Sequence, residues 1–493
     1  MPNYLHKIYS VILCVLCYTA TYAQTTSRKI RYEVEAGTYL SSTSTNPFWI
    51  RSNQYGEIPL ESQGFTLRAQ IQKEYDPYLS SKKGKGKFSY GYGARAVLNA
   101  GRINQVLISE LYGKLRYGAV ELSAGRRRGI IGLVDSTLSS GSYIWSGNAL
   151  PMPKVEISIP NYMPLFKNGL IAVKGNYAHG WFGRNDSLDN SYLHQKSLYI
   201  RLGKPSWRFK VYGGFNHQVQ WGGRLLYNRV DNGVKITRYG TDWETYLYVV
   251  NGKSLYTLDT LVVQNGAASA EGGNRVGNHL GSLDLGLEYE SENSRWLFYR
   301  QSFYEAGALF YLNNVADGLN GISFVRKNAQ FGIIRVVFEY LQTSSQGGSI
   351  SSGRTSISQL RGAEDYFNNG RYIDGWVYKG QTIGTPYIMP LRYTSGLPQN
   401  LDSNPNRIVN NRVEVYTLGI MSRIGNVDLL TRFTSSQNFG NYYYPPFSIS
   451  QKSFQQQFIV PVNKYTFTVN LAYDSEGVLQ ENYGLNFLIK RTF

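Results

Sequence analysis

Apolar and polar residues alternate with a period of two along much of this chain. In KYTFTVNLAY (Lys464–Tyr473), every second position holds an aromatic or aliphatic residue, and threonine, asparagine or alanine lies between. The same alternation recurs in the segments 88–98, 283–290, 334–340 and 427–433. Because successive side chains of a β-strand point to opposite faces, the pattern predicts strands with one apolar face and one polar or small face.

Two fold classes use strands of this kind, and they differ in where the apolar face points. A soluble β-sandwich turns that face inward, whereas a transmembrane barrel turns it toward lipid and lines its lumen with polar groups. A sandwich of this length would need several domains, yet no Pro-rich, Ser-rich or single-charge linker divides the chain. We therefore favour an all-β fold, a transmembrane antiparallel outer-membrane β-barrel.

The composition fits a barrel. The chain has 41 Tyr and 51 Gly against 5 Met, and tyrosine forms the aromatic girdles of membrane barrels while glycine suits turns and crowded lumen positions. Since a strand and its share of the loops use about 25 residues, we expect roughly 16–20 strands. The longest predicted external segments are Arg238–Leu280 and Thr343–Asn400.

The N-terminal segment 1–23 is typical of a secretory signal peptide. A short polar region ends at Lys7 and is followed by an apolar stretch from Ile8 to Cys17. Thr21 and Ala23 are the small residues expected before a cleavage site. The alternative is a short N-terminal anchor, although the stretch is too short to span a bilayer. Both cysteines lie inside this segment. We therefore predict one cysteine-free barrel domain, 24–493, exported to the outer membrane of a Gram-negative bacterium.

The C-terminus predicts a lipid-facing last strand. Apolar residues again occupy alternate positions and the chain ends on an aromatic residue, a pattern that the barrel-assembly machinery reads in outer-membrane barrels. The residues of this predicted assembly signal are Tyr483, Leu485, Phe487, Ile489 and Phe493. The strand must pair with the first one, because an open sheet edge in hydrocarbon leaves backbone groups without hydrogen bonds.

Several longer motifs resemble the Wzi capsule-assembly family, in the family's order. They include WSGNALPMPKVEISIP (145–160), NHLGSLDLGLEYE (278–290), ADGLNGISF (316–324), FEYLQTSSQGG (338–348) and DYFNNGRYIDGWVYKGQTIGTP (365–386), with NPFWIRSNQYGEIP (46–59) near the start. The resemblance implies a barrel of about 18 strands that binds and retains exported capsular polysaccharide at the cell surface, without catalysis. The best-known members carry an N-terminal helical plug, but Arg28–Leu40 alternates like a strand here. Another plug or folded-in loops would then close the lumen.

The net charge points to an anionic ligand. The full chain carries +18, which becomes +17 when Lys7 is removed with the signal. For an exported protein the matching polyanions are acidic polysaccharide and the phosphates of lipopolysaccharide. The motif GRRRG makes Arg126, Arg127 and Arg128 candidate polymer contacts, with a basic turn as the alternative.

Aromatic residues next to amides and carboxylates are candidates for sugar binding, because flat rings stack on sugar C–H faces. Three segments, EDYFNNGRY, WVYKG and FNHQVQWGG, combine both residue types in what we predict to be loops. The candidates are Asp365, Tyr366, Trp376, Tyr378, His217 and Trp221. The alternative for each aromatic ring is a place in the interfacial girdle.

Signals for catalysis are weak. No serine lies in a Gly-x-Ser-x-Gly elbow, and the four histidines after the signal have no metal-ligand spacing. We expect no metal, no cofactor and no nucleic acid, and a monomer in contact with outer-membrane lipid. His217 and His279 could still form an enzymatic site in space, as in barrel proteases. The main alternative function is a porin or substrate-specific channel, which would have an open lumen.

Overall fold

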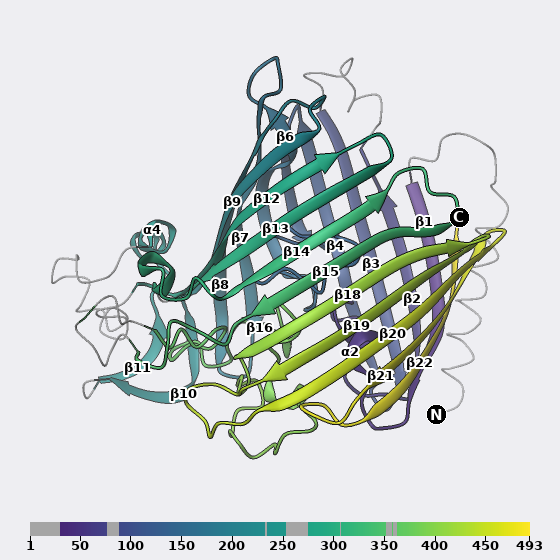
Figure 1. Cartoon of the computed structure of the whole chain (residues 1–493). Helices are drawn as coiled ribbons and strands as arrows, with labels where there is room; N and C mark the ends of the chain where they lie inside the picture. The colour runs from purple at the N-terminus through teal and green to yellow at the C-terminus, as the bar shows by residue number, and fades with distance from the viewer. Residues whose placement is uncertain are drawn as a thin grey trace, which may run out of the picture.

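The computed structural model describes residues 30–75, 88–231, 234–252, 275–305, 307–351, 357 and 362–493. Twenty strands form one antiparallel sheet. Two of them, β10 and β11, form a hairpin beside β8, and the other eighteen close into a ring because β1 pairs with β22. Figure 1 shows this ring with the β10–β11 hairpin projecting from one end. The predicted signal peptide, 1–23, lies outside the described residues.

The first nine wall strands are β1 (Ile30–Ser41), β2 (Gly64–Lys73), β3 (Phe88–Gly101), β4 (Gln105–Tyr117), β5 (Val120–Arg126), β6 (Pro153–Pro164), β7 (Ile171–Arg184), β8 (Leu188–Leu202) and β9 (Phe209–Trp221). The other nine are β12 (Asn278–Glu290), β13 (Ser294–Tyr304), β14 (Gly318–Arg326), β15 (Gly332–Gln342), β18 (Val413–Ile424), β19 (Val427–Asn438), β20 (Ile449–Val462), β21 (Tyr465–Asp474) and β22 (Asn482–Thr492). The loops hold α2 (Phe48–Arg51), β10 (Gly223–Asp231), β11 (Val234–Tyr239), α4 (Trp243–Asn251), β16 (Val377–Tyr378) and β17 (Gln381–Thr382). Each predicted alternating segment is a wall strand.

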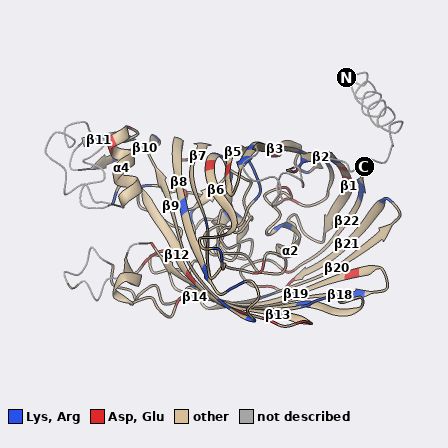
Figure 2. Ribbon diagram, turned by 90° about the horizontal axis from the view of Figure 1, so that it is seen from above, with Lys and Arg blue, Asp and Glu red and all other residues tan. Residues whose placement is uncertain are grey.

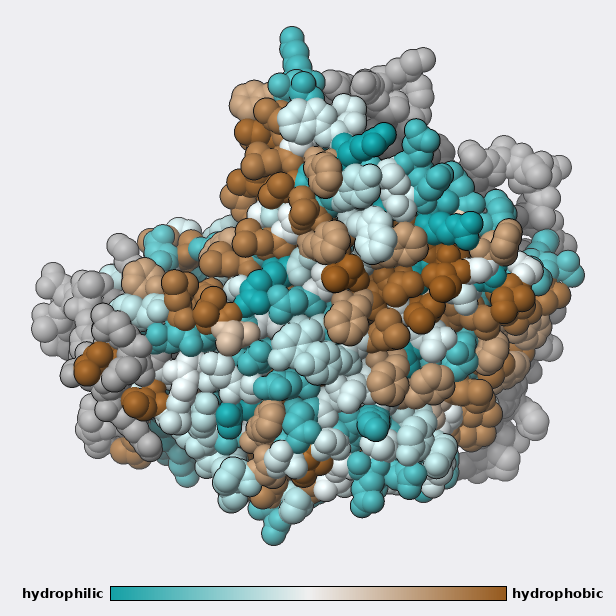
Figure 3. All heavy atoms as spheres, viewed as in Figure 1, coloured by the Kyte–Doolittle hydropathy of each residue, from teal (hydrophilic) through white to brown (hydrophobic). Residues whose placement is uncertain are grey.

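The wall is apolar outside and polar inside, which decides between the two predicted fold classes. In β12, Leu283 is 45% and Leu285 64% exposed, whereas Asp284 and Glu288 are 1% and 4% exposed. Figure 3 shows apolar residues gathered over the strands on the outer surface. A soluble sandwich would bury these leucines, so the pattern identifies a barrel whose outer face contacts lipid.

Aromatic rings lie near both ends of the outer face, as expected for girdles at the two membrane interfaces. At the end that holds the chain termini, Phe88 packs on Tyr117 and Phe209 on Tyr289, each pair with ring centres 4.9 Å apart. At the other end, the Tyr340–Tyr416 and Tyr473–Tyr483 ring centres are each 4.8 Å apart.

Loop lengths give the orientation of the barrel. Turns such as 118–119, 425–426 and 463–464 lie at the end where β1 begins and β22 ends. The long loops 42–63, 127–152, 222–277 and 343–412 leave and re-enter the wall at the opposite end. Outer-membrane barrels have short periplasmic turns and long extracellular loops. The long loops are therefore external. The predicted segment Thr343–Asn400 lies in loop 343–412, whereas the predicted segment Arg238–Leu280 extends into β12, which begins at Asn278, and its residues 253–274 lie outside the described residues.

The C-terminal strand closes the ring as predicted. β22 pairs with β1 from Glu33↔Thr492 to Ser41↔Gly484, and the Phe493 amide donates to the Tyr32 carbonyl at 2.9 Å. Tyr483, Leu485, Phe487 and Ile489 are all at least 36% exposed on the outer face. The geometry fits a lipid-facing seam, and the role of these residues as an assembly signal remains a prediction.

We expect Phe493→Asp to impair insertion strongly. A charge at the end of the closing strand replaces an apolar contact at the membrane interface and alters the predicted assembly signal. Quantitative immunoblots of outer-membrane fractions should show little heat-modifiable barrel, with Lys464→Asp on a nearby periplasmic turn as the control. Normal barrel levels in the Phe493→Asp cells would contradict the prediction.

Candidate functional site: the loops that fill the lumen

Three external loops, 42–63, 127–152 and 343–412, fold into the lumen, and we call them the plug. Figure 2 shows α2 and further loop segments inside the ring of strands. The plug is bonded to inward-facing residues of the wall: the Trp49 indole donates to Thr434 Oγ1 at 3.2 Å, and the Ser140 amide donates to Glu339 at 2.6 Å. The lumen is therefore closed by folded-in loops, one of the two alternatives to a helical plug.

Fully buried aromatic rings form the centre of the plug. Trp376 is 0% exposed, and its indole donates to the Ile144 carbonyl at 2.9 Å, which joins loop 343–412 to loop 127–152. Tyr143 stacks on Phe303 of the wall with ring centres 3.6 Å apart. Phe48 of α2 stacks on Tyr387 at 5.2 Å, which joins the third loop to the same core. The plug thus has a continuous hydrophobic core of its own.

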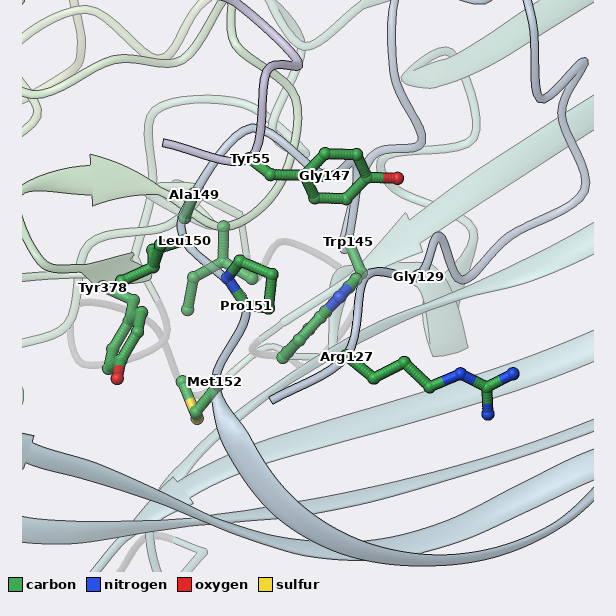
Figure 4. A pocket seen from close by; sticks show the side chains of 11 residues that line it. Tyr55, Arg127, Gly129, Trp145, Gly147, Ala149, Leu150, Pro151, Met152 and Tyr378 are labelled. Atoms are coloured by element: carbon green, nitrogen blue, oxygen red, sulfur yellow. The ribbon is translucent and has the colours of Figure 1, made fainter. Parts of the chain in front are cut away.

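The space inside this core is small. Figure 4 shows a cavity between Tyr55, Trp145, Met152 and Tyr378, with a volume of about 10 Å³. A cavity of that size holds about one water molecule. The plug therefore packs like a protein interior at this level of the bore.

Buried carboxylates hold the plug backbone to the ends of the strands. Glu305 accepts from the Tyr143 hydroxyl at 2.6 Å and from the Phe367 amide at 3.1 Å. Asp317 accepts from the Gln346 amide at 2.7 Å and the Tyr366 hydroxyl at 2.8 Å. Burial raises the pKa of both carboxyls.

A separate ionic cluster fixes loop 42–63 to the wall. Glu57, 2% exposed, accepts from Arg95 Nε at 2.9 Å, lies 3.6 Å from Arg68 Nε and pairs with Arg128. Ser109 also donates to its carboxylate at 2.7 Å. Burial alone would raise the pKa of Glu57, but the three guanidinium groups lower that pKa to about 2. Glu57 is therefore ionised throughout the physiological range.

The predicted aromatic contacts in loop 343–412 are not accessible to a polymer. Tyr366 and Trp376 are 0% exposed and Tyr378 is 2% exposed. Asp365 is half-buried, with Asn368 and Asn411 donating to it at 2.9 and 2.8 Å. The prediction that these residues present free faces to sugar is wrong in this structure. The loop folds inward, so its aromatic residues form the core of the plug.

His217 and Trp221 are not loop residues, contrary to prediction. Both belong to β9 and lie on its outward-facing side, where α4 covers Trp221 and His279 packs on His217. Trp221 packs on Tyr246 of α4 with ring centres 5.3 Å apart, and His217 Nε2 lies 2.8 Å from His279 Nδ1. Both side chains are buried, which removes them from direct contact with a polymer. Among the described residues, no group of three or more His, Cys, Asp or Glu side chains could hold a metal ion.

The three arginines of GRRRG lie where the wall meets the plug. Arg127 pairs with Glu121 at 2.5 Å, and Arg128 pairs with Glu57. Arg126 donates to the Tyr378 hydroxyl at 3.1 Å. Arg127 and Arg128 are thus structural ion-pair partners inside the barrel, and Arg126 lines a separate cavity of about 810 Å³.

Arg127 and Arg128 also line a polar chamber on the inner side of the wall. The chamber has a volume of about 230 Å³ and is lined by both acidic and basic side chains. The charged side chains that line the chamber are Glu121, Glu156, Arg127, Arg128, Lys154 and Lys174.

Sequence reasoning missed the residues that organise the plug, above all Glu57 and Tyr143. Glu57 is the one carboxylate in the segment Asn46–Pro59, which is otherwise rich in apolar and amide residues. A lone acid in such a segment was the available signal for a buried ion pair. No comparable signal distinguishes Tyr143 from the many other tyrosines.

Comparisons with known proteins identify no family. No family model matches the sequence, and no curated protein matches it. Structural matches include Pseudomonas aeruginosa OccK5 (OpdH), with a TM-score of 0.45, 8% identity and coverage of 94% of this chain and 97% of that chain. P. aeruginosa OpdQ matches with a TM-score of 0.45, 6% identity and 95% and 99% coverage.

A third match is the anion-selective porin from Comamonas acidovorans, with a TM-score of 0.37, 8% identity and 94% and 98% coverage. The closed ring of strand pairs, rather than these distant likenesses, establishes the fold. Within the described residues, no helix is long and apolar enough to cross a membrane. The chain is an outer-membrane β-barrel, and its resemblance to the Wzi family remains a prediction.

Proposed function

We propose that this barrel binds an exported acidic polysaccharide at its external, loop-bearing end and retains it at the cell surface, as the Wzi resemblance implies. The main observation in support of this proposal is the filled lumen. Aromatic side chains with 0% exposure pack across the bore, so a ligand as large as a polymer meets the external surface first. The function then depends on exposed groups around the plug.

The β10–β11 hairpin supplies such groups. Arg224 stands directly opposite Arg238, and Val230 opposite Lys235, in the register of the two strands. Lys235 and Arg238 are exposed. Because Arg224 is already paired with Asp189 at 2.8 Å, the exposed Lys235 and Arg238 side chains are the cations that a polyanion would contact. Each contact would be weak, so retention would come from many contacts along the polymer.

We expect Lys235→Gln with Arg238→Gln to release polymer into the medium without lowering barrel abundance. Both side chains are exposed, so their loss affects ligand contact more than folding, and high salt should have a similar effect by screening. The measurement is polymer in washed cells against polymer in the medium. The control is Arg208→Gln with Lys464→Gln, which removes two exposed cations at the periplasmic end. Unchanged retention in the hairpin variant would contradict the proposed contact.

The second candidate is a solute channel, and the charged chamber at Glu121 and Arg127 favours it. A polar, charged lining is what a selective pore requires. The two functions differ in purified protein: an occluded barrel is closed in a planar lipid bilayer, whereas a channel conducts. A deletion strain separates them in cells. Loss of surface polymer supports retention, and loss of uptake of a small solute with a normal capsule supports the channel.

A further inference from the structure

The wall has a step on its external side, next to β5. β5 is the shortest wall strand, Val120–Arg126, and its pairing with β4 stops at Leu111↔Arg126. β4 continues outward to Gln105, so its edge from Gln105 to Glu110 extends beyond the ladder with β5. After Arg126 the chain turns inward as plug loop 127–152, and β6 begins opposite Arg126 at Pro153. The wall is therefore lower between β4 and β7 than on either side.

A cavity of about 810 Å³ lies at this step, and we call it the notch. One side is formed by Val106, Ile108 and Leu111, which point outward and are 72%, 50% and 56% exposed. The back is formed by plug residues, among them Gln381 and Tyr393. The notch thus connects the lipid-facing surface with the polar interior of the external loops.

Basic side chains line the inner part of the notch. The lining includes three cations, Arg126, Lys379 and Arg392, but only one carboxylate, Glu61. In the described part of the chain, Arg126 and Lys379 form no ion pair: Arg126 donates to the Ile108 carbonyl at 3.4 Å as well as to Tyr378, and Lys379 donates to the Arg184 carbonyl at 3.1 Å. Both cations keep donors that could receive an anion.

Two buried polar atoms of the notch, one donor and one acceptor, have no hydrogen-bond partner among the described residues. Arg392 binds Asp186 through Nη2 at 3.1 Å, but its Nε is buried with no hydrogen-bond partner. Gln381 Oε1, an acceptor, is also buried without a partner, and it would accept from a hydroxyl group of a ligand and not from an anionic oxygen. Both residues line the notch, and leaving such atoms unpaired is unfavourable unless a ligand or water satisfies them.

We infer that the notch is a lateral binding site for a phosphorylated glycolipid of the outer leaflet. An acyl chain lies along Val106, Ile108 and Leu111, and a phosphate reaches Arg126 and Lys379 from the membrane side. The apolar outer wall and the excess of cations inside match an anionic amphiphile better than a free sugar polymer, which has no apolar chain for the outer wall. The site is distinct from the polymer-binding hairpin and does not depend on the polysaccharide proposal.

The test uses the detergent-purified full barrel and native mass spectrometry with three probes: bisphosphorylated lipid A, the same lipid without its phosphates, and inorganic phosphate. We expect lipid A to bind, the phosphate-free lipid to bind at least about tenfold more weakly, and inorganic phosphate to compete only at high concentration. Arg126→Gln with Lys379→Gln should reduce lipid A binding by about tenfold or more. Lys379→Gln alone removes one exposed cation, together with its hydrogen bond to the Arg184 carbonyl at the end of β7, and leaves Arg126 in place.

The matched control is Lys452→Gln with Lys464→Gln, which removes two exposed cations away from the notch. Heat-modifiable migration on gels verifies that each variant is folded. Equal binding of lipid A to the notch and control variants would overturn the inference. Equal binding of the phosphorylated and phosphate-free lipids would do the same, and tight binding of inorganic phosphate alone would identify a simple anion site in place of a lipid site.

Discussion

Replacing Trp376 with alanine is expected to make a closed barrel leaky. Trp376 is 0% exposed, contacts Trp145 and Phe182 with ring centres 6.3 and 6.0 Å away, and hydrogen-bonds to the Ile144 carbonyl. Removing a buried tryptophan costs about 3–5 kcal/mol, because the lost contacts leave a cavity. The wall is held by strand pairing, so the loss should be confined to the plug.

The measurement is ion conductance in planar lipid bilayers. We expect the wild-type barrel to stay closed and Trp376→Ala to show frequent openings at equal protein levels. Trp243→Ala is the matched control, since Trp243 of α4 is 71% exposed and lies outside the plug. A closed Trp376→Ala barrel would show that the plug tolerates the cavity, whereas an open wild-type barrel would contradict the occluded lumen itself.

Glu57→Gln is expected to release loop 42–63 from the wall. The substitution keeps the side-chain shape but leaves Arg68, Arg95 and Arg128 close together without their shared carboxylate. Removing one member of a buried ion pair typically costs about 3–5 kcal/mol. Hydrogen exchange in 42–63 should rise sharply, and Glu61→Gln in the same loop should have little effect, because Glu61 forms no ion pair among the described residues.

The pH dependence gives this prediction a second measurement. The pKa of Glu57 is lowered from 4.5 to about 2, so the folded state holds the ionised form more tightly than the unfolded state does. The stabilisation, about 3 kcal/mol from the size of the shift, is complete above pH 4.5 and is lost as the pH falls toward 2. Protection of 42–63 should follow that curve in the wild type. A similar loss in Glu57→Gln would assign the acid sensitivity to another group.

The sequence was most informative where side-chain direction alone decides the structure. Leu283 and Asp284 must lie on opposite faces of a strand, so alternation was enough to predict the lipid-facing wall and the closing strand. It could not show that β4 has a register shift, where Arg95 pairs with Glu110 but Ala96 with Ile108. A single extra residue of this kind leaves the average periodicity almost unchanged.

The candidate site was harder to predict because it depends on where loops fold. Trp376 and Tyr366 have the composition of a sugar-binding loop, but aromatic rings are equally suited to a hydrophobic core. Only the tertiary structure shows that loop 343–412 turns into the lumen. His217 and Trp221 differ again. They continue the outward face of β9, where Trp221 is covered by α4, beyond the β10–β11 hairpin, and His217 packs on His279 of β12. Local sequence patterns contain no information on the inward folding of this loop or on the covering of β9.

The docking of α2 has a consequence for the order of assembly. The Phe48 amide donates to Asp474 Oδ2 at 2.8 Å, and Gln455 donates to the Trp49 carbonyl at 3.1 Å. The first external loop is thus fastened to β20 and β21, which are among the last strands to be synthesised. Contacts between segments so far apart form late, since they require closure of a very long loop of chain. A barrel that stalls before its final strands are in place would therefore be both unsealed and unplugged, so that completion of the wall and closure of the bore become a single event.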